Sequence, residues 1–160
     1  MNKRLMTALC FFCALTFWMI SCSKSENDWN VSEHHDDNSH NSGQNCMNCH
    51  YQEGPGEGWF SLAGSVSRDD QNDSILSIRV FDALSQDLLT TVEVDRLGNF
   101  YTTASINFIN GTTIDIIDGQ GQVVKAMGTV VKNGQCNLCH NNSFQDEIII
   151  PWEYYSSSSV

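Results

Sequence analysis

Apolar residues recur at every second position in several short runs between residues 59 and 131. In the run from Ser74 to Phe81, for example, Leu76, Ile78 and Val80 fall on one face. Runs of this length and period, bounded by Gly, Asp and Asn, are typical of β-strands with one buried face. No proline interrupts the stretch. The pattern predicts a mainly β fold, a small antiparallel β-sandwich of six or seven strands.

Six runs carry the pattern, and two of the connections between them are clear turn sequences. Asp95–Asn99 and Asp118–Gly121 combine aspartate with glycine, which is typical of tight turns. The predicted strands are Trp59–Val66, Ser74–Phe81, Leu88–Val94, Phe100–Tyr101, Thr112–Asp118 and Val123–Val131.

Two copies of Cys-x-x-Cys-His flank the β-rich stretch, at Cys46–His50 and Cys136–His140. The chain has five histidines, and two of them directly follow the second cysteine of a pair. This pentapeptide is the attachment signal for c-type haem. The cysteine thiols add to the porphyrin edge and the histidine binds the iron. The predicted attachment residues are Cys46, Cys49, Cys136 and Cys139, and the predicted proximal iron ligands are His50 and His140.

With these two motifs the chain resembles a small multihaem c-type cytochrome. The resemblance implies two covalently attached haems, one at each end of the β-sandwich. It also implies an electron carrier rather than a catalyst, because the iron cycles between ferrous and ferric states. A haem-based sensor or a small haem enzyme with an open iron site is an alternative.

The four motif cysteines have other possible uses. They suit a four-thiolate zinc site, a pair of disulfides or redox-active thiols. None of these uses requires a histidine directly after the second cysteine of each motif. A non-redox surface lipoprotein with a zinc or disulfide clasp is therefore the alternative from another functional class.

The β-rich stretch, near residues 60 to 130, resembles carboxypeptidase-regulatory-like domains. The resemblance rests on the strand sequence Gly64-Ser65-Val66, on a strand ending Val80-Phe81-Asp82, and on Asp95-x-x-Gly98-x-Phe100. Such domains are usually structural spacers, so the resemblance implies no catalytic residue.

The sixth iron ligands must come from the remaining histidines and methionines. We predict His40 for one haem and Met127 for the other. Because an iron with histidine and methionine has a higher potential than a bis-histidine iron, the two midpoint potentials should differ, the C-terminal haem being the higher. The other candidates are His34, His35 and Met47.

The first residues predict export and lipid anchoring. Lys3 and Arg4 precede an apolar run, Leu9–Ile20, that is shorter than a membrane-spanning helix requires. The run ends in Met19–Cys22, which resembles a bacterial lipobox with Cys22 as the lipidated residue. A signal peptide cleaved elsewhere is the alternative. We expect an outer-membrane lipoprotein, facing the periplasm or the cell surface.

The chain therefore divides into five predicted segments. Polar residues without an apolar period precede the first motif, and this composition predicts a disordered tether. The segments are a signal peptide over 1–21, the tether over 22–45, a first haem-binding segment over 46–58, the β-sandwich over 59–132, and a second haem-binding segment with a tail over 133–160.

The excess of acidic over basic residues limits the kinds of partner that we expect the protein to bind. Removing Lys3 and Arg4 from the eight basic residues leaves six against 19 acidic ones, a formal charge of −13. Nucleic acid is therefore not an expected partner, because phosphate binding needs a basic face. An acidic surface favours a redox partner with a basic docking face, or simply keeps an exported protein soluble.

Overall fold

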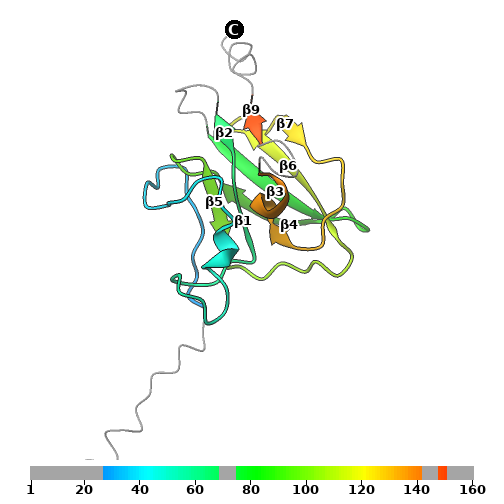
Figure 1. The fold of residues 1–160 in the computed structure, drawn as a ribbon. Helices are drawn as coiled ribbons and strands as arrows, with labels where there is room; N and C mark the ends of the chain where they lie inside the picture. The colour runs from blue at the N-terminus through cyan, green and yellow to red at the C-terminus, as the bar shows by residue number, and fades with distance from the viewer. Residues whose placement is uncertain (1–26, 69–74, 142–147, 151–160) are drawn as a thin grey trace, which may run out of the picture.

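The computed structural model describes residues 27–68, 75–141 and 148–150, and the predicted signal peptide and Cys22 lie outside them. Within this part of the chain, nine short strands and two single-turn helices make up the regular structure (Figure 1). The elements are η1 Cys46–Asn48, β1 Leu62–Ser65, β2 Ser67–Arg68, β3 Leu76–Asp82, β4 Leu88–Glu93, β5 Asn99–Thr102, β6 Thr112–Asp118, β7 Val123–Ala126, β8 Gly134–Gln135, α2 Cys136–Cys139 and β9 Ile149–Ile150.

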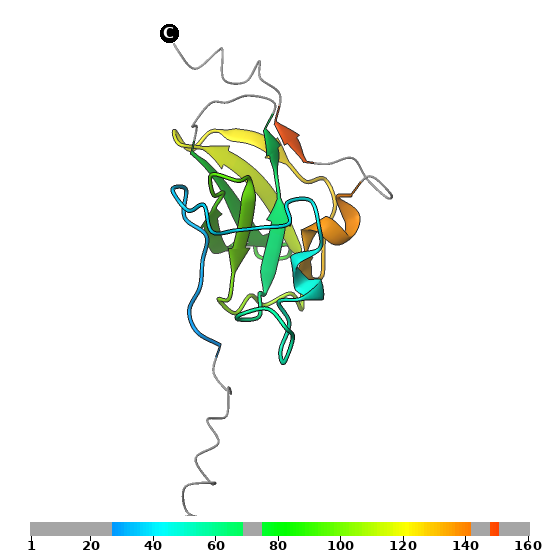
Figure 2. The same cartoon turned by 60° about the vertical axis from the view of Figure 1, so that its left-hand side comes forward.

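The strands form two main sheets, and the prediction of a mainly β fold is confirmed. One sheet has the order β5-β1-β8 and the other has the order β4-β3-β6-β7, while β2 and β9 form a separate pair. Pairing is antiparallel in most of the two main sheets, and β8 is parallel to β1. The arrangement is consistent with a small β-sandwich (Figure 2).

Most of the alternating apolar residues lie in the core, although Leu88 at the start of β4 is exposed. Leu76, Ile78 and Val80 of β3 are buried, whereas Ile75 beside them is exposed. Burying such side chains is the main favourable term in folding. The core cluster consists of Leu62, Val66, Leu76, Ile78, Val80, Val92, Val94, Phe100, Ile116 and Ile150.

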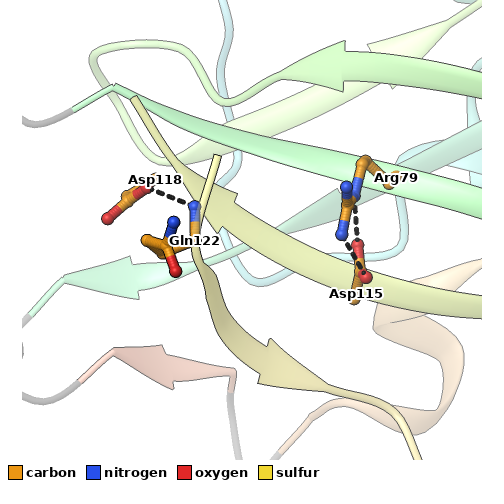
Figure 3. A network of polar contacts seen from close by, with 4 residues as sticks. All are labelled: Arg79, Asp115, Asp118 and Gln122. Carbon is orange, nitrogen blue, oxygen red and sulfur yellow. Dashed lines mark hydrogen bonds and ion pairs between the residues drawn. The ribbon is translucent and has the colours of Figure 1, made fainter. Parts of the chain in front are cut away.

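The outer face of the four-stranded sheet carries a cross-strand ion pair. Arg79 of β3 lies directly opposite Asp115 of β6. Two parallel hydrogen bonds of 2.9 and 2.8 Å join the guanidinium to the carboxylate (Figure 3). The pair is partly exposed, so its contribution to stability is modest.

Both predicted aspartate turns are present, and they have the same hydrogen-bonding pattern. Oδ1 of Asp95 accepts hydrogen bonds from the backbone N–H groups of Leu97 and Asn99. Oδ1 of Asp118 accepts hydrogen bonds from the backbone N–H groups of Gln120 and Gln122, and Figure 3 shows the bond from Gln122. The fourth residue of each turn is a glycine with φ of +84° or +80°, a conformation that glycine adopts without steric cost.

Residues 27–45, which we call the N-terminal arm, pack on the sandwich. The side chain of Asn27 makes two hydrogen bonds with the backbone of Trp59, of 2.6 and 3.0 Å. Ser32 is buried, and its backbone N–H donates to the carbonyl of Tyr101 in β5. The prediction of a disordered tether is therefore wrong for these residues. The arm is held by backbone and polar side-chain hydrogen bonds, which leave no apolar period in the sequence.

The helices of the described residues are single turns, and none is long and apolar enough to cross a membrane.

Candidate functional site

The two Cys-x-x-Cys-His motifs have a similar local fold, a 3-10 turn in the first and an α-helical turn in the second. Each begins with one helical turn, and the histidine N–H donates to the carbonyl of the first cysteine, at 3.0 Å in the first motif and 2.9 Å in the second. Residues three and four positions apart share one side of a helical turn. The first cysteine of each motif is partly buried and the second is exposed. Both cysteines and the histidine of a motif can therefore face one group.

The two motifs lie side by side, and the expectation of one motif at each end of the sandwich is wrong. Asn45 and Gln135 each precede the first cysteine of a motif, and their side chains form a hydrogen bond of 3.0 Å. Nδ2 of Asn137, inside the second motif, donates to the carbonyl of Gln44 at 2.8 Å. Residues at the start of the two motifs thus contact each other.

Strand β1 brings the motifs together. β8 pairs with β1 in parallel, with Gly134 opposite Leu62, and the second motif follows β8 directly. The motif itself approaches β1 closely at Gly64, where an added Cβ would lie 2.7 Å from Cβ of Cys136 and 2.5 Å from the ring of Phe100. A residue without a side chain at position 64 therefore permits the second motif to sit on β1.

A buried polar network holds the second motif in this position. The side chain of Asn137 accepts from the backbone N–H of Ser65 and donates to its hydroxyl, both at 3.0 Å. The Ser65 hydroxyl donates to Asn99 of β5 at 2.7 Å and accepts from the N–H of Gly43 in the arm at 2.9 Å. Buried polar groups with all partners in place specify one arrangement of the elements around them. Sequence reasoning missed these residues, because Asn137 occupies a spacer position of the motif.

The His50 ring is oriented by contacts on several sides. Its Nδ1 lies 3.0 Å from the carbonyl oxygen of Glu57. A carbonyl only accepts hydrogen bonds, so Nδ1 carries the proton in the neutral imidazole and Nε2 keeps its lone pair for a metal. The ring stacks on Phe60, with centroids 4.3 Å apart, and Phe60 stacks on Tyr101 at 4.8 Å. Phe60 therefore orients a predicted iron ligand.

The arm places His40 beside His50, with ring centroids 5.8 Å apart. His40 is exposed, whereas His34 is buried and packs on His35 at 5.0 Å. Met127 follows β7 and is half-buried, and its backbone N–H donates to the carbonyl of Ile114 at 2.8 Å. Of the two predicted sixth ligands, His40 has a ring contact with a motif histidine among the described residues.

The first cysteine of each motif does not resemble a redox-active cysteine. Burial raises the pKa of Cys136 to about 12, and the neighbouring Cys46 adds to the rise. Burial likewise raises the pKa of Cys46. Redox-active cysteines have a lowered pKa, because the thiolate is the reactive form. The first cysteine of each motif is therefore a protonated thiol at neutral pH.

The zinc and disulfide alternatives find no support in the described residues. Cys46, Cys49, Cys136 and Cys139 are free thiols. No three His, Cys, Asp or Glu side chains in residues 27–68, 75–141 and 148–150 are grouped as metal ligands. Although the motifs are neighbours, their cysteines are neither joined as disulfides nor grouped as a four-thiolate cage in the described residues.

A cleft of about 400 Å³ opens beside the second motif. This volume falls in the range of small-molecule sites, about 300–1,000 Å³. Its walls come from the arm, from β1 and β2, from the Asp95 turn, from the second motif and from the residue before β9. The lining residues are Ser42, Gly43, Ser65, Val66, Ser67, Arg96, Leu97, Gly98, Asn137, His140 and Ile148.

Comparison of the chain with protein-family models, with curated proteins and with solved structures finds no match.

Proposed function

We propose that the chain is an exported, lipid-anchored dihaem c-type cytochrome that carries electrons between redox partners at the cell envelope. The observation that carries the proposal is the helical turn with which both motifs begin. In each, a helical turn places two free thiols and a histidine within one turn of the chain. This arrangement matches what thioether attachment and axial ligation of one haem require.

The side chains around the motifs suit a covalently held haem. Cys46 and Cys49 would attach the first haem, and Cys136 and Cys139 the second. The hydrogen bond from Nδ1 of His50 to the Glu57 carbonyl leaves Nε2 for iron, and such second-shell contacts fix a ligand's tautomer and orientation. His140 lines the cleft beside the second motif. When bound, each haem supplies a one-electron couple.

His40 is the proposed sixth ligand of the first haem. Two imidazoles that would both bind one iron must lie close together, because each metal–nitrogen bond is about 2 Å. The His40 and His50 centroids are 5.8 Å apart. Met127 remains the proposed ligand of the second haem on the basis of sequence alone.

The proposed role is transfer rather than catalysis, with redox proteins as partners. The formal charge of −13 after removal of the leader favours a partner with a basic docking face, since complementary charge raises the rate of encounter. Spectra recorded with added carbon monoxide or cyanide test this role. A six-coordinate carrier binds them weakly, whereas an open-site sensor or enzyme binds them readily.

The test of haem attachment is intact mass together with haem staining on a denaturing gel. Protein produced with haem-attachment machinery should exceed its polypeptide mass by two haems. Changing Cys46 and Cys49 to Ala should remove one haem, and changing Cys136 and Cys139 to Ala should remove the other. About one zinc per chain with no Soret absorption would contradict the proposal.

A further inference from the structure

The cleft beside the second motif contains one guanidinium group, that of Arg96. Arg96 follows the buried Asp95, whose carboxylate orders the turn, and its own backbone N–H donates to the Asp36 carbonyl at 3.1 Å. Its backbone is therefore held on two sides, while its side chain is exposed at the cleft. His140 of the second motif lines the same cleft.

Arg96 is also a rare positive charge, one of six basic residues against 19 acidic ones once the leader is removed. The guanidinium of Arg79 is engaged by Asp115, and the ammonium of Lys125 donates to the Ile149 carbonyl at 3.2 Å. In the described part of the chain, no hydrogen bond or ion pair engages the Arg96 guanidinium. An arginine presents a planar fork of donors that matches a carboxylate.

We infer that Arg96 and the cleft beside His140 form the binding subsite for the carboxylate edge of the haem on the second motif. The inference rests on the proposed function. Haem has an apolar ring and two propionate groups. Val66, Leu97 and Ile148 give the cleft an apolar wall, and Ser42 and Ser67 add hydroxyl groups. Without a nearby cation, these propionates would lie unpaired on a strongly acidic protein, which disfavours their charged form.

The test replaces Arg96 by Gln in the full chain and measures the midpoint potentials of both haems by spectroelectrochemical titration. Loss of a nearby positive charge destabilises the ferrous state relative to the ferric state. The potential of the second-motif haem should fall, corresponding to a threefold to tenfold shift of its ferrous–ferric equilibrium; tenfold is about 59 mV for one electron. The fall should shrink at high ionic strength, because the side chain is exposed.

Three further proteins make the result specific. Arg79→Gln removes a positive charge from the outer face of the four-stranded sheet instead of from the cleft. Arg96→Lys keeps the positive charge but lacks the planar guanidinium, so this variant should shift the potential less than Arg96→Gln. Repeating Arg96→Gln in the Cys46→Ala/Cys49→Ala background assigns the shift to the second-motif haem. An equal shift in Arg79→Gln, a shift confined to the first haem, or no shift would overturn the inference. Wild-type protein lacking haem by mass would instead overturn the proposed function.

Discussion

Gly64 is a position at which the packing of the second motif depends directly on the absence of a side chain. A Cβ there would lie 2.5 Å from Cζ of Phe100 and 2.7 Å from Cβ of Cys136. Phe100 is buried in the core, and Cys136 is held by the parallel pairing of β8 with β1. Neither neighbour can move away without disturbing a packed element.

Gly64→Ala should therefore lower the free energy of unfolding by about 1–3 kcal/mol, the usual cost of overpacking a core. Chemical denaturation measures the change. Gly128→Ala is the matched control, because an added Cβ at Gly128 meets nothing within 4 Å. Equal stability of the two variants would show that the second motif does not approach β1 as described.

At the scale of elements, the contact between η1 and α2 changes the expected redox behaviour. Two motifs at opposite ends of the sandwich would hold independent haems, so that changes at His40 and at Met127 would each affect one haem. The observed hydrogen bonds between Asn45 and Gln135, and between Asn137 and Gln44, instead hold the motifs together. Charges that lie close together interact strongly where water is partly excluded.

If the proposed haems are bound, we therefore predict that they titrate as an interacting pair. Reduction of one haem adds an electron near the other and makes the second reduction less favourable. The titration of the two-haem protein should be broader than the sum of the titrations of the two single-haem variants, Cys46→Ala/Cys49→Ala and Cys136→Ala/Cys139→Ala. Spectroelectrochemistry at low ionic strength measures both. A two-haem curve equal to that sum would mean that the sites are independent.

At the scale of the whole molecule, the N-terminal arm shortens the predicted tether. A tether over 22–45 would let the domain move far from a membrane. Asn27 is instead bound to Trp59, so only the four residues 23–26 separate it from Cys22, a stretch of five Cα-to-Cα steps. At no more than about 3.6 Å per step, this stretch can span at most about 18 Å. An anchored domain would therefore exchange electrons with partners close to the membrane surface.

The proposed anchor is tested by Cys22→Ser, which removes the thiol that would carry the lipid. This variant should move from the membrane fraction to the soluble or unprocessed fraction, because lipid chains provide the attachment. Fractionation with immunoblotting measures the change, and Cys13→Ser, inside the predicted leader, is the control. Correct cleavage and membrane retention of the Cys22→Ser protein would contradict the lipobox interpretation.

The sequence alone determined the features that depend on neighbouring residues. β6 was predicted and observed over Thr112–Asp118, because alternating burial is a local pattern. The turns at Asp95 and Asp118 were also predicted, because the aspartate binds its own backbone and glycine adopts positive φ. The spacing within Cys-x-x-Cys-His likewise suits a single turn in which cysteines and histidine share one side.

The tertiary structure decided where these local units lie. Asn45 and Gln135 are 90 residues apart in the sequence and hydrogen-bonded in the fold. Their contact depends on β8, a two-residue strand too short to show a period. The arm and the Asn137 network depend on polar hydrogen bonds between distant segments. Hydrophobic periodicity reports only which face of a strand is buried, so it carries no information on which distant polar groups become partners.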